Sequence, residues 1–280
     1  MTTLLSEEDY KTASVKVSWG NSVGTIVVYL ISPIIISIAS WKGVFWFAAA
    51  CGIIMIFIWN RFSYEIQPAK TKTVETGEEP KKKVSAKLLF APVMLGAMLG
   101  IILQGMLRDG VTTWMPSYIS ETYKLQSVIS ILTGVILPIF SIITFRVAGM
   151  LYKKITNPML CAGIIFGVGA VSALALYLFT GQNPIFSVLF SALLTGSMHG
   201  VNLILICMIP PYFNKYGNVS TVSGVLNSCT YIGSAISTYG VALLSERAGW
   251  TFTLLVWLGI AVAGTAVCLI CARPWKKKMG

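Results

Sequence analysis

Charged residues are scarce in this sequence, and acidic residues are the scarcest. Charged residues make up only 11% of the chain, whereas about a quarter of a soluble domain is charged. Hydrophobic residues make up 55%, and the mean hydropathy is +0.77. The net charge is +11, but the basic residues lie mostly in short polar segments between apolar runs. The composition therefore predicts an integral membrane protein that contacts the lipid bilayer and binds no nucleic acid.

Motifs for catalysis or metal binding are also missing. The sequence has one histidine, no H-E-x-x-H motif, no P-loop and no paired carboxylates within an apolar run. The six cysteines lie almost entirely in apolar runs, so no disulfide framework is expected. Cys268 and Cys271 form a CxxC without a second pair, which favours a small-residue helix face over a redox or metal site. We therefore expect no enzyme activity, no catalytic residue, no metal and no cofactor.

Long apolar runs dominate the rest of the chain. About 20 apolar residues cross the hydrocarbon core as a helix, and eight runs reach roughly that length. They cover residues 17–38, 43–59, 88–107, 128–147, 159–179, 185–209, 219–244 and 251–272. The runs lack the two-residue alternation of a membrane β-barrel. The sequence thus predicts an all-α polytopic membrane protein with about eight transmembrane helices.

One long polar segment divides these runs into two groups. Residues 61–87 mix charges of both signs with two prolines and have few apolar side chains. Such a segment cannot bury a core, so we predict a linker at 62–87. Residues 1–61 would then hold two helices, and residues 88–280 would hold six.

The distribution of basic residues predicts the orientation. When successive loops are assigned to alternate sides, seventeen of the 21 lysines and arginines fall on the side of the termini and the linker. Only Lys42, Lys124 and Arg247 fall on the other side, and Arg108 lies within a span. We therefore expect both termini in the cytoplasm of a multi-pass protein of the inner (plasma) membrane.

Arg108 and Asp109 stand out because, edge residues aside, they are the only charges within a long apolar run. They lie near the far end of the segment 91–118. A charge in the membrane costs about 2.5 to 3.5 kcal/mol on insertion scales, which favours a functional role. Two alternatives are that the residues pair with each other, or that Arg108 reaches the headgroups from a helix end.

An internal repeat emerges when the chain is shifted by 209 positions. The matched pairs are Ser14 with Ser223, Ser18 with Asn227, Gly24 with Gly233, Thr25 with Ser234 and Trp41 with Trp250. Coincidence in a biased composition is the alternative. A true repeat would make the first two spans equivalent to the last two, as in the parallel halves of a transporter. The first half would then lack its opening four helices.

Two stretches resemble a known family. The stretch LRDGVTTWMPSYISETYKLQ resembles the seventh-helix signature of the organophosphate:phosphate antiporters, which belong to the major facilitator superfamily. The stretch GSMHGVNLILICMIPPYFNKYGNVSTVSGVLNSCTYIGSAIS, followed by RAGW, is similar to the tenth and eleventh helices of that family. The resemblance implies an N-terminally truncated major facilitator fold with helices five to twelve. It also implies exchange of a sugar phosphate or glycerol phosphate for phosphate by alternating access.

The resemblance also implies roles for particular residues. Arg108 matches the family arginine that binds the substrate phosphate, although a partner arginine on the first helix has no counterpart here. Asp109 stands where the family usually has an uncharged residue, and it could offset the positive field that an anion needs. His199 is placed on a cavity-lining helix, where it would bind or titrate, or else only form an interhelical hydrogen bond. Asn202 would share its face.

Two aromatic residues complete the predicted site. Trp114 and Tyr118 would line or gate it, or would instead belong to the aromatic belt at the membrane interface. Because four helices are missing, the chain alone is expected to transport poorly unless a partner supplies them. The competing interpretation is a non-transporting membrane sensor or subunit, or a fragment of a disrupted transporter gene.

Overall fold

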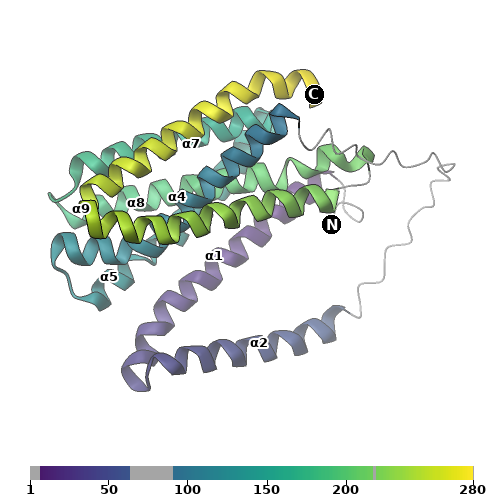
Figure 1. Cartoon of the computed structure of the whole chain (residues 1–280). Coiled ribbons are helices and arrows are strands. Elements are labelled where there is room, and N and C mark those ends of the chain that lie inside the picture. The colour runs from purple at the N-terminus through teal and green to yellow at the C-terminus, as the bar shows by residue number, and fades with distance from the viewer. Residues whose placement is uncertain (1–6, 64–90, 217–218, 280) are drawn as a thin grey trace.

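The described part of the chain consists of helices joined by short turns. The computed structural model describes residues 7–63, 91–216 and 219–279, and no strand occurs among them (Figure 1). The predicted linker 62–87 lies outside these residues, except for its first two. The helices are α1 (Glu7–Ile38), α2 (Trp41–Ser63), α4 (Pro92–Tyr123), α5 (Ser127–Thr133), α6 (Ile136–Lys154), α7 (Pro158–Phe179), α8 (Pro184–Asn202), the π-helix η1 (Leu203–Cys207), the 3-10 helix η2 (Pro210–Tyr216) and α9 (Val219–Met279). The predicted all-α class is therefore confirmed.

Seven helices in the described ranges are long and apolar enough to cross a membrane. The last of them, α9, has 61 residues and bends at Gly249. At 1.5 Å per residue, 61 residues would extend about three times the thickness of a hydrocarbon core. Figure 1 shows the two arms of α9 folding back along the same bundle. Each arm holds one predicted span, 219–244 or 251–272.

Gly249 makes this bend possible through its backbone conformation. Its φ of 77° and ψ of 173° lie in a region that is essentially restricted to glycine. A Cβ on Gly249 would meet no atom within 4 Å, so a substitution would strain the backbone without a steric clash.

We expect Gly249→Ala to destabilise the protein by about 1 to 3 kcal/mol. Gly259→Ala is the matched control, because Gly259 is helical in the second arm and also faces open space. This control should be neutral or stabilising, since alanine favours a helix by about 1 kcal/mol over glycine. Thermal unfolding in detergent measures both, and equal midpoints for the two variants would contradict the strained bend.

Helix α4 is longer than the sequence predicted. The apolar run ends at Leu107, but the helix continues to Tyr123, so Arg108 lies near its middle. The second half contains threonine, serine, proline and aromatic residues, which lower its hydropathy. It remains helical because it packs against α9 and α8, with which α4 has extensive contacts.

Small residues bring α4 and the first arm of α9 into backbone contact. A Cβ on Gly105 would collide with the carbonyl oxygen of Thr230, and one on Gly233 would collide with that of Ile102. A Cβ on Gly110 would collide with the Ser237 hydroxyl. This contact resembles the close approach that small residues permit between membrane helices.

The CxxC pair serves the same purpose in the second arm. Cys271 packs against Gly96 of α4 and Cys268 against Gly100. No disulfide joins any of the six cysteines, which all lie in the described ranges, and no group of three metal-ligating side chains occurs within those ranges.

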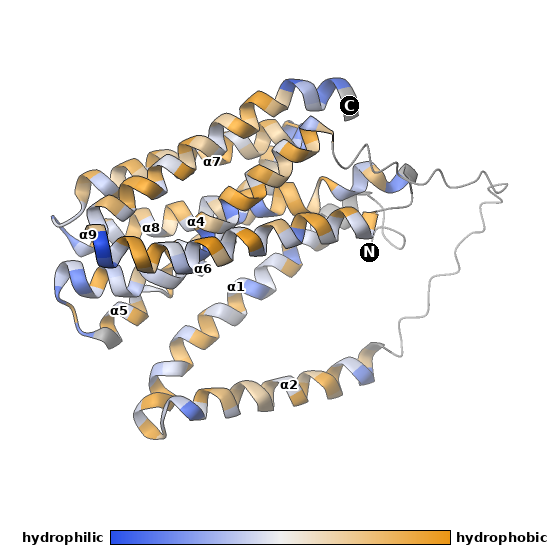
Figure 2. Cartoon of the chain, viewed as in Figure 1, coloured by the Kyte–Doolittle hydropathy of each residue, from blue (hydrophilic) through white to orange (hydrophobic). Residues whose placement is uncertain are grey.

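Helices α1 and α2 lie at the edge of the bundle (Figure 1). α1 packs against α6, whereas α2 packs against α1. Large apolar side chains of α2 such as Phe45, Trp46 and Phe57 are exposed. Figure 2 shows hydrophobic residues over most of α2, with hydrophilic ones near its two ends. This pattern suits a helix that faces lipid.

Candidate functional site

A cavity of about 450 Å³ lies between α1, α4, α6, α8 and α9. It is half polar in character, because polar side chains from α1, α4 and α8 face an apolar wall from α6. The lining residues are Val17, Ser18, Asn21, Ser22, Thr25, Arg108, Asp109, Thr112, Leu137, Pro138, Phe145, Thr195, His199, Asn202 and Tyr231. Three of the five predicted site residues, Arg108, His199 and Asn202, are among them.

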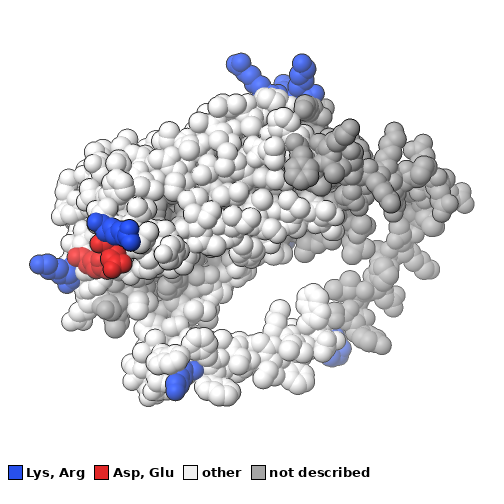
Figure 3. All heavy atoms as spheres, in the orientation of Figure 1, with Lys and Arg blue, Asp and Glu red and all other residues white. Residues whose placement is uncertain are grey.

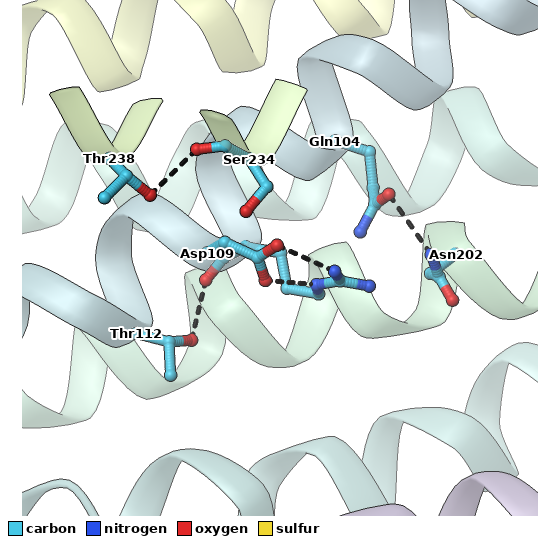
Figure 4. Close-up of polar contacts among 7 residues, drawn as sticks. Gln104, Asp109, Thr112, Asn202, Ser234 and Thr238 are labelled. Carbon is cyan, nitrogen blue, oxygen red and sulfur yellow. Dashed lines mark hydrogen bonds and ion pairs between the residues drawn. The ribbon is translucent and has the colours of Figure 1, made fainter. Parts of the chain in front are cut away.

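Arg108 and Asp109 form a bidentate ion pair at the cavity. Nε of Arg108 donates to Oδ1 of Asp109 at 2.6 Å, and Nη2 donates to Oδ2 at 2.8 Å (Figure 4). The side chains are 17% and 25% exposed. The pairing alternative from the sequence is therefore confirmed. Snorkelling from a helix end is wrong, because α4 continues for four turns beyond Arg108.

Neighbouring side chains hold this pair in place. Thr112 donates to the carbonyl oxygen of Arg108 at 2.6 Å, one turn along α4. Ser234 of α9 points toward Asp109 in Figure 4. The first arm of α9 can bring Ser234 this close because Gly105 and Gly110 leave room on α4.

The electrostatic balance of the cavity is close to neutral. Arg108 and Asp109 contribute opposite charges at contact distance. Apart from them, the lining residues carry no formal charge when the imidazole of His199 is neutral. A ligand therefore meets a dipolar ion pair, and the protonation states of Asp109 and His199 decide the net charge.

His199 projects from α8 onto the apolar side of the cavity. Its ring makes an edge-to-face contact with Phe145 of α6, with ring centroids 5.6 Å apart. No described residue forms a hydrogen bond with its ring nitrogens, so the interhelical hydrogen bond considered from the sequence is not formed. The ring is thus positioned by packing.

Asn202 lies one turn beyond His199 and contacts a residue that the sequence analysis missed. Its Nδ2 donates to Oε1 of Gln104 at 3.3 Å (Figure 4). Gln104 is fully buried on α4, one turn before Arg108, and its Nε2 has no partner among the described residues. Thr195, which lines the cavity, likewise has a buried hydroxyl without a partner there. Buried polar atoms without partners are rare, and they mark candidate contacts for a polar ligand.

A polar stripe on α1 was also missed as part of the site. Ser18, Asn21, Ser22 and Thr25 of α1 line the cavity. Their spacing of three to four residues places them on one face, and this signal is visible in the sequence. The internal repeat aligns Thr25 with Ser234. Thr25 lines the cavity, and Ser234 lies beside Asp109.

Trp114 and Tyr118 lie outside this cavity, contrary to the prediction that they line it. Tyr118 is ten residues beyond Arg108, about 15 Å along the helix. It is fully buried, and its hydroxyl is 2.9 Å from the Ser187 hydroxyl of α8 and 3.0 Å from that of Thr180. Trp114 donates through Nε1 to the carbonyl oxygen of Thr238 at 3.2 Å. Both residues therefore tie helices together.

The comparisons with known proteins agree with this architecture at the level of the family. No curated protein matches the chain. Residues 1–238 match the Major Facilitator Superfamily, and this stretch includes α1, the ion pair of α4 and most of the first arm of α9. The match covers well over half of the sequence. The chain therefore belongs to the Major Facilitator Superfamily, a family of membrane transporters.

Proposed function

We propose that this chain takes part in secondary transport of a small organic anion that bears a phosphate group, in exchange for inorganic phosphate. A sugar phosphate or a glycerol phosphate is the preferred substrate. The observation that carries the proposal is Arg108, which lies midway along α4 at a cavity in the membrane-spanning bundle. A guanidinium within the membrane-spanning bundle costs free energy, so its presence there favours a functional role.

Arg108 has donors left for a phosphate. A guanidinium carries five N–H donors, and Asp109 accepts two of them. The remaining donors include both N–H groups of Nη1. Guanidinium groups bind phosphate oxygens through paired, charge-assisted hydrogen bonds.

Asp109 sets a condition on anion binding. With both residues charged, the pair has no net charge, so an anion competes with the carboxylate for Arg108. A protonated Asp109 would withdraw this competition. The pair therefore supports coupling of anion binding to a proton, alongside the exchange that the family resemblance implies.

The organic part of the substrate would meet the other side of the cavity. Asn202, the buried amide of Gln104 and the Thr195 hydroxyl provide donors and acceptors within the same bundle. Ser18 and Asn21 face them from α1. Hydroxyl groups of a sugar or glycerol suit this set of neutral polar groups.

Placement of the chain in the membrane follows from its charge distribution. We propose that both termini lie in the cytoplasm and that the protein resides in the inner membrane. Residues 88–280 would form one six-helix bundle and residues 1–61 two helices of the other, joined by the linker 62–87. Rocking of one bundle against the other would expose the cavity to alternate sides, with any further helices supplied by a partner.

Two measurements on the full chain test the proposal. Glycerol-3-phosphate, glucose-6-phosphate and inorganic phosphate should raise its thermal unfolding midpoint in detergent, whereas glycerol and glucose should not. Proteoliposomes loaded with phosphate should then take up labelled phosphate or sugar phosphate saturably. Binding without uptake would favour a sensor. Equal stabilisation by the neutral compounds would contradict an anion site.

A further inference from the structure

We propose that a groove between α7 and the C-terminal end of α9 binds the headgroup of an anionic phospholipid. The groove has a volume of about 550 Å³ and is separate from the cavity around Arg108. The proposal does not depend on what the protein transports, because it rests on a different set of residues.

Three basic residues provide the charge of this groove. Arg273, Lys276 and Lys277 line it and are exposed. They share one helix face, since residues three and four positions apart are neighbours. Figure 3 shows basic side chains at this end of α9, with no acidic side chain beside them on the face in view. None of the three forms an ion pair with an acidic residue in the described ranges.

The rest of the groove is apolar and faces the membrane. Leu160 of α7 and Leu269 and Ala272 of α9 line it. Leu269 is 44% exposed and the adjoining Ile270 is 73% exposed, so the wall continues onto a surface suited to acyl chains. A headgroup phosphate would meet the three cations while its acyl chain lies along the leucines.

Asn157 fixes the shape of the groove. Its Nδ2 donates to the carbonyl oxygen of Ala272 at 2.7 Å, which joins the start of α7 to α9. Its Oδ1 accepts from the backbone N–H groups of Met159 and Leu160 at 3.0 and 3.2 Å. The N-terminus of α7, the positive end of its helix dipole, therefore lies at the groove.

A membrane lipid fits this combination better than a free anion. Basic side chains at the end of a membrane helix lie at the level of the headgroups, and basic pockets between helices on the cytoplasmic side bind anionic lipids. A free phosphate would use the cations but would gain nothing from Leu160 and Leu269. A ligand with an acyl chain would use both the three cations and the apolar wall.

Native mass spectrometry of the full chain, mixed with phosphatidylglycerol and phosphatidylcholine, tests the proposal. The wild type should retain phosphatidylglycerol preferentially. The triple variant Arg273→Gln, Lys276→Gln, Lys277→Gln should lose about 100-fold of this preference, at roughly fivefold per basic residue. Leu269→Gln should weaken retention without changing the charge. If the triple variant does not fold, Lys276→Gln is measured alone.

A second triple variant serves as the control. Arg146, Lys153 and Lys154 belong to the same half of α6 and lie outside the groove. Their replacement by glutamine removes the same charge and should leave the preference intact. An equal loss in both triple variants would show that general surface charge, and not the groove, retains the lipid, and it would overturn the proposal. If the groove variant also lost glycerol-3-phosphate binding by the same factor, the proposal would be overturned, because that compound has no acyl chain and should bind only at the cavity around Arg108.

Discussion

Arg108→Ala is expected to lower the affinity for phosphate compounds at least 100-fold and to abolish their uptake. The substitution removes the fork of donors from the cavity and leaves Asp109 there without its partner. Removing one partner of a buried ion pair costs about 3 to 5 kcal/mol, part of which appears as lower stability. Ligand-induced shifts in unfolding temperature and uptake into proteoliposomes measure the two effects.

The double variant Arg108→Ala, Asp109→Ala separates binding from stability. Without either charge, no unpaired ion remains, so the double variant should recover much of the lost stability while binding stays absent. Arg108→Lys should show an intermediate affinity, because lysine keeps the charge but loses the paired donors. Full uptake by an active Arg108→Ala protein would show that the anion binds elsewhere.

Asp109→Asn is expected to strengthen anion binding near neutral pH by about tenfold, which corresponds to about 1.4 kcal/mol. Asparagine resembles the protonated carboxyl group, so Arg108 keeps its positive charge for the ligand. In the wild type, the affinity should rise only when the pH falls far enough into the acidic range to protonate Asp109, which its bidentate contact with Arg108 holds ionised. In Asp109→Asn this dependence should largely disappear. Equilibrium binding of labelled phosphate across a pH series measures both changes.

His199→Gln serves as the control for this prediction. Protonation of His199 would also add positive charge at low pH and would also favour an anion, so the direction of the pH effect alone does not identify the group. A pH dependence that persists in Asp109→Asn but vanishes in His199→Gln would assign the coupling to the histidine. Weaker binding in Asp109→Asn would show that the carboxylate assists the ligand.

The membrane fold could be predicted because hydropathy reports it directly. A lipid-facing helix such as α2 has to be apolar along its length, so the hydropathy of its sequence indicates that it lies in the membrane. The predicted span within α4 ended too early, at Leu107, because Thr112, Ser117 and Glu121 lower the hydropathy of the second half of the helix. Its helical conformation depends on contacts with residues of α9 that lie more than a hundred positions away in the sequence.

The site could be predicted only in part. Arg108 was identified because a charge within an apolar run is conspicuous in one sequence. The α1 stripe was missed because single amides and hydroxyls are common in membrane helices, and only packing shows which ones face a cavity. Gln104 was missed because its contact with Asn202 depends on how α4 packs against α8. Tyr118 was misplaced because an aromatic residue near a helix end has the same sequence signature whether it lines a site, lies at the interface or ties helices together.

The glycine contact between α4 and α9 also determines which parts of the bundle can move. Backbone atoms near Gly105 and Gly233 already touch, so these two helices have no side-chain layer that could rearrange between them. Arg108, Asp109 and Ser234 must therefore travel together as one rigid body. α1 meets its neighbours through side chains instead, as where Val15 approaches Gly149 and the Tyr29 ring approaches Gly134. Any motion that opens or closes the cavity would therefore occur at the surface of α1, while the backbones of α4 and α9 that carry Arg108, Asp109 and Ser234 keep their relative positions.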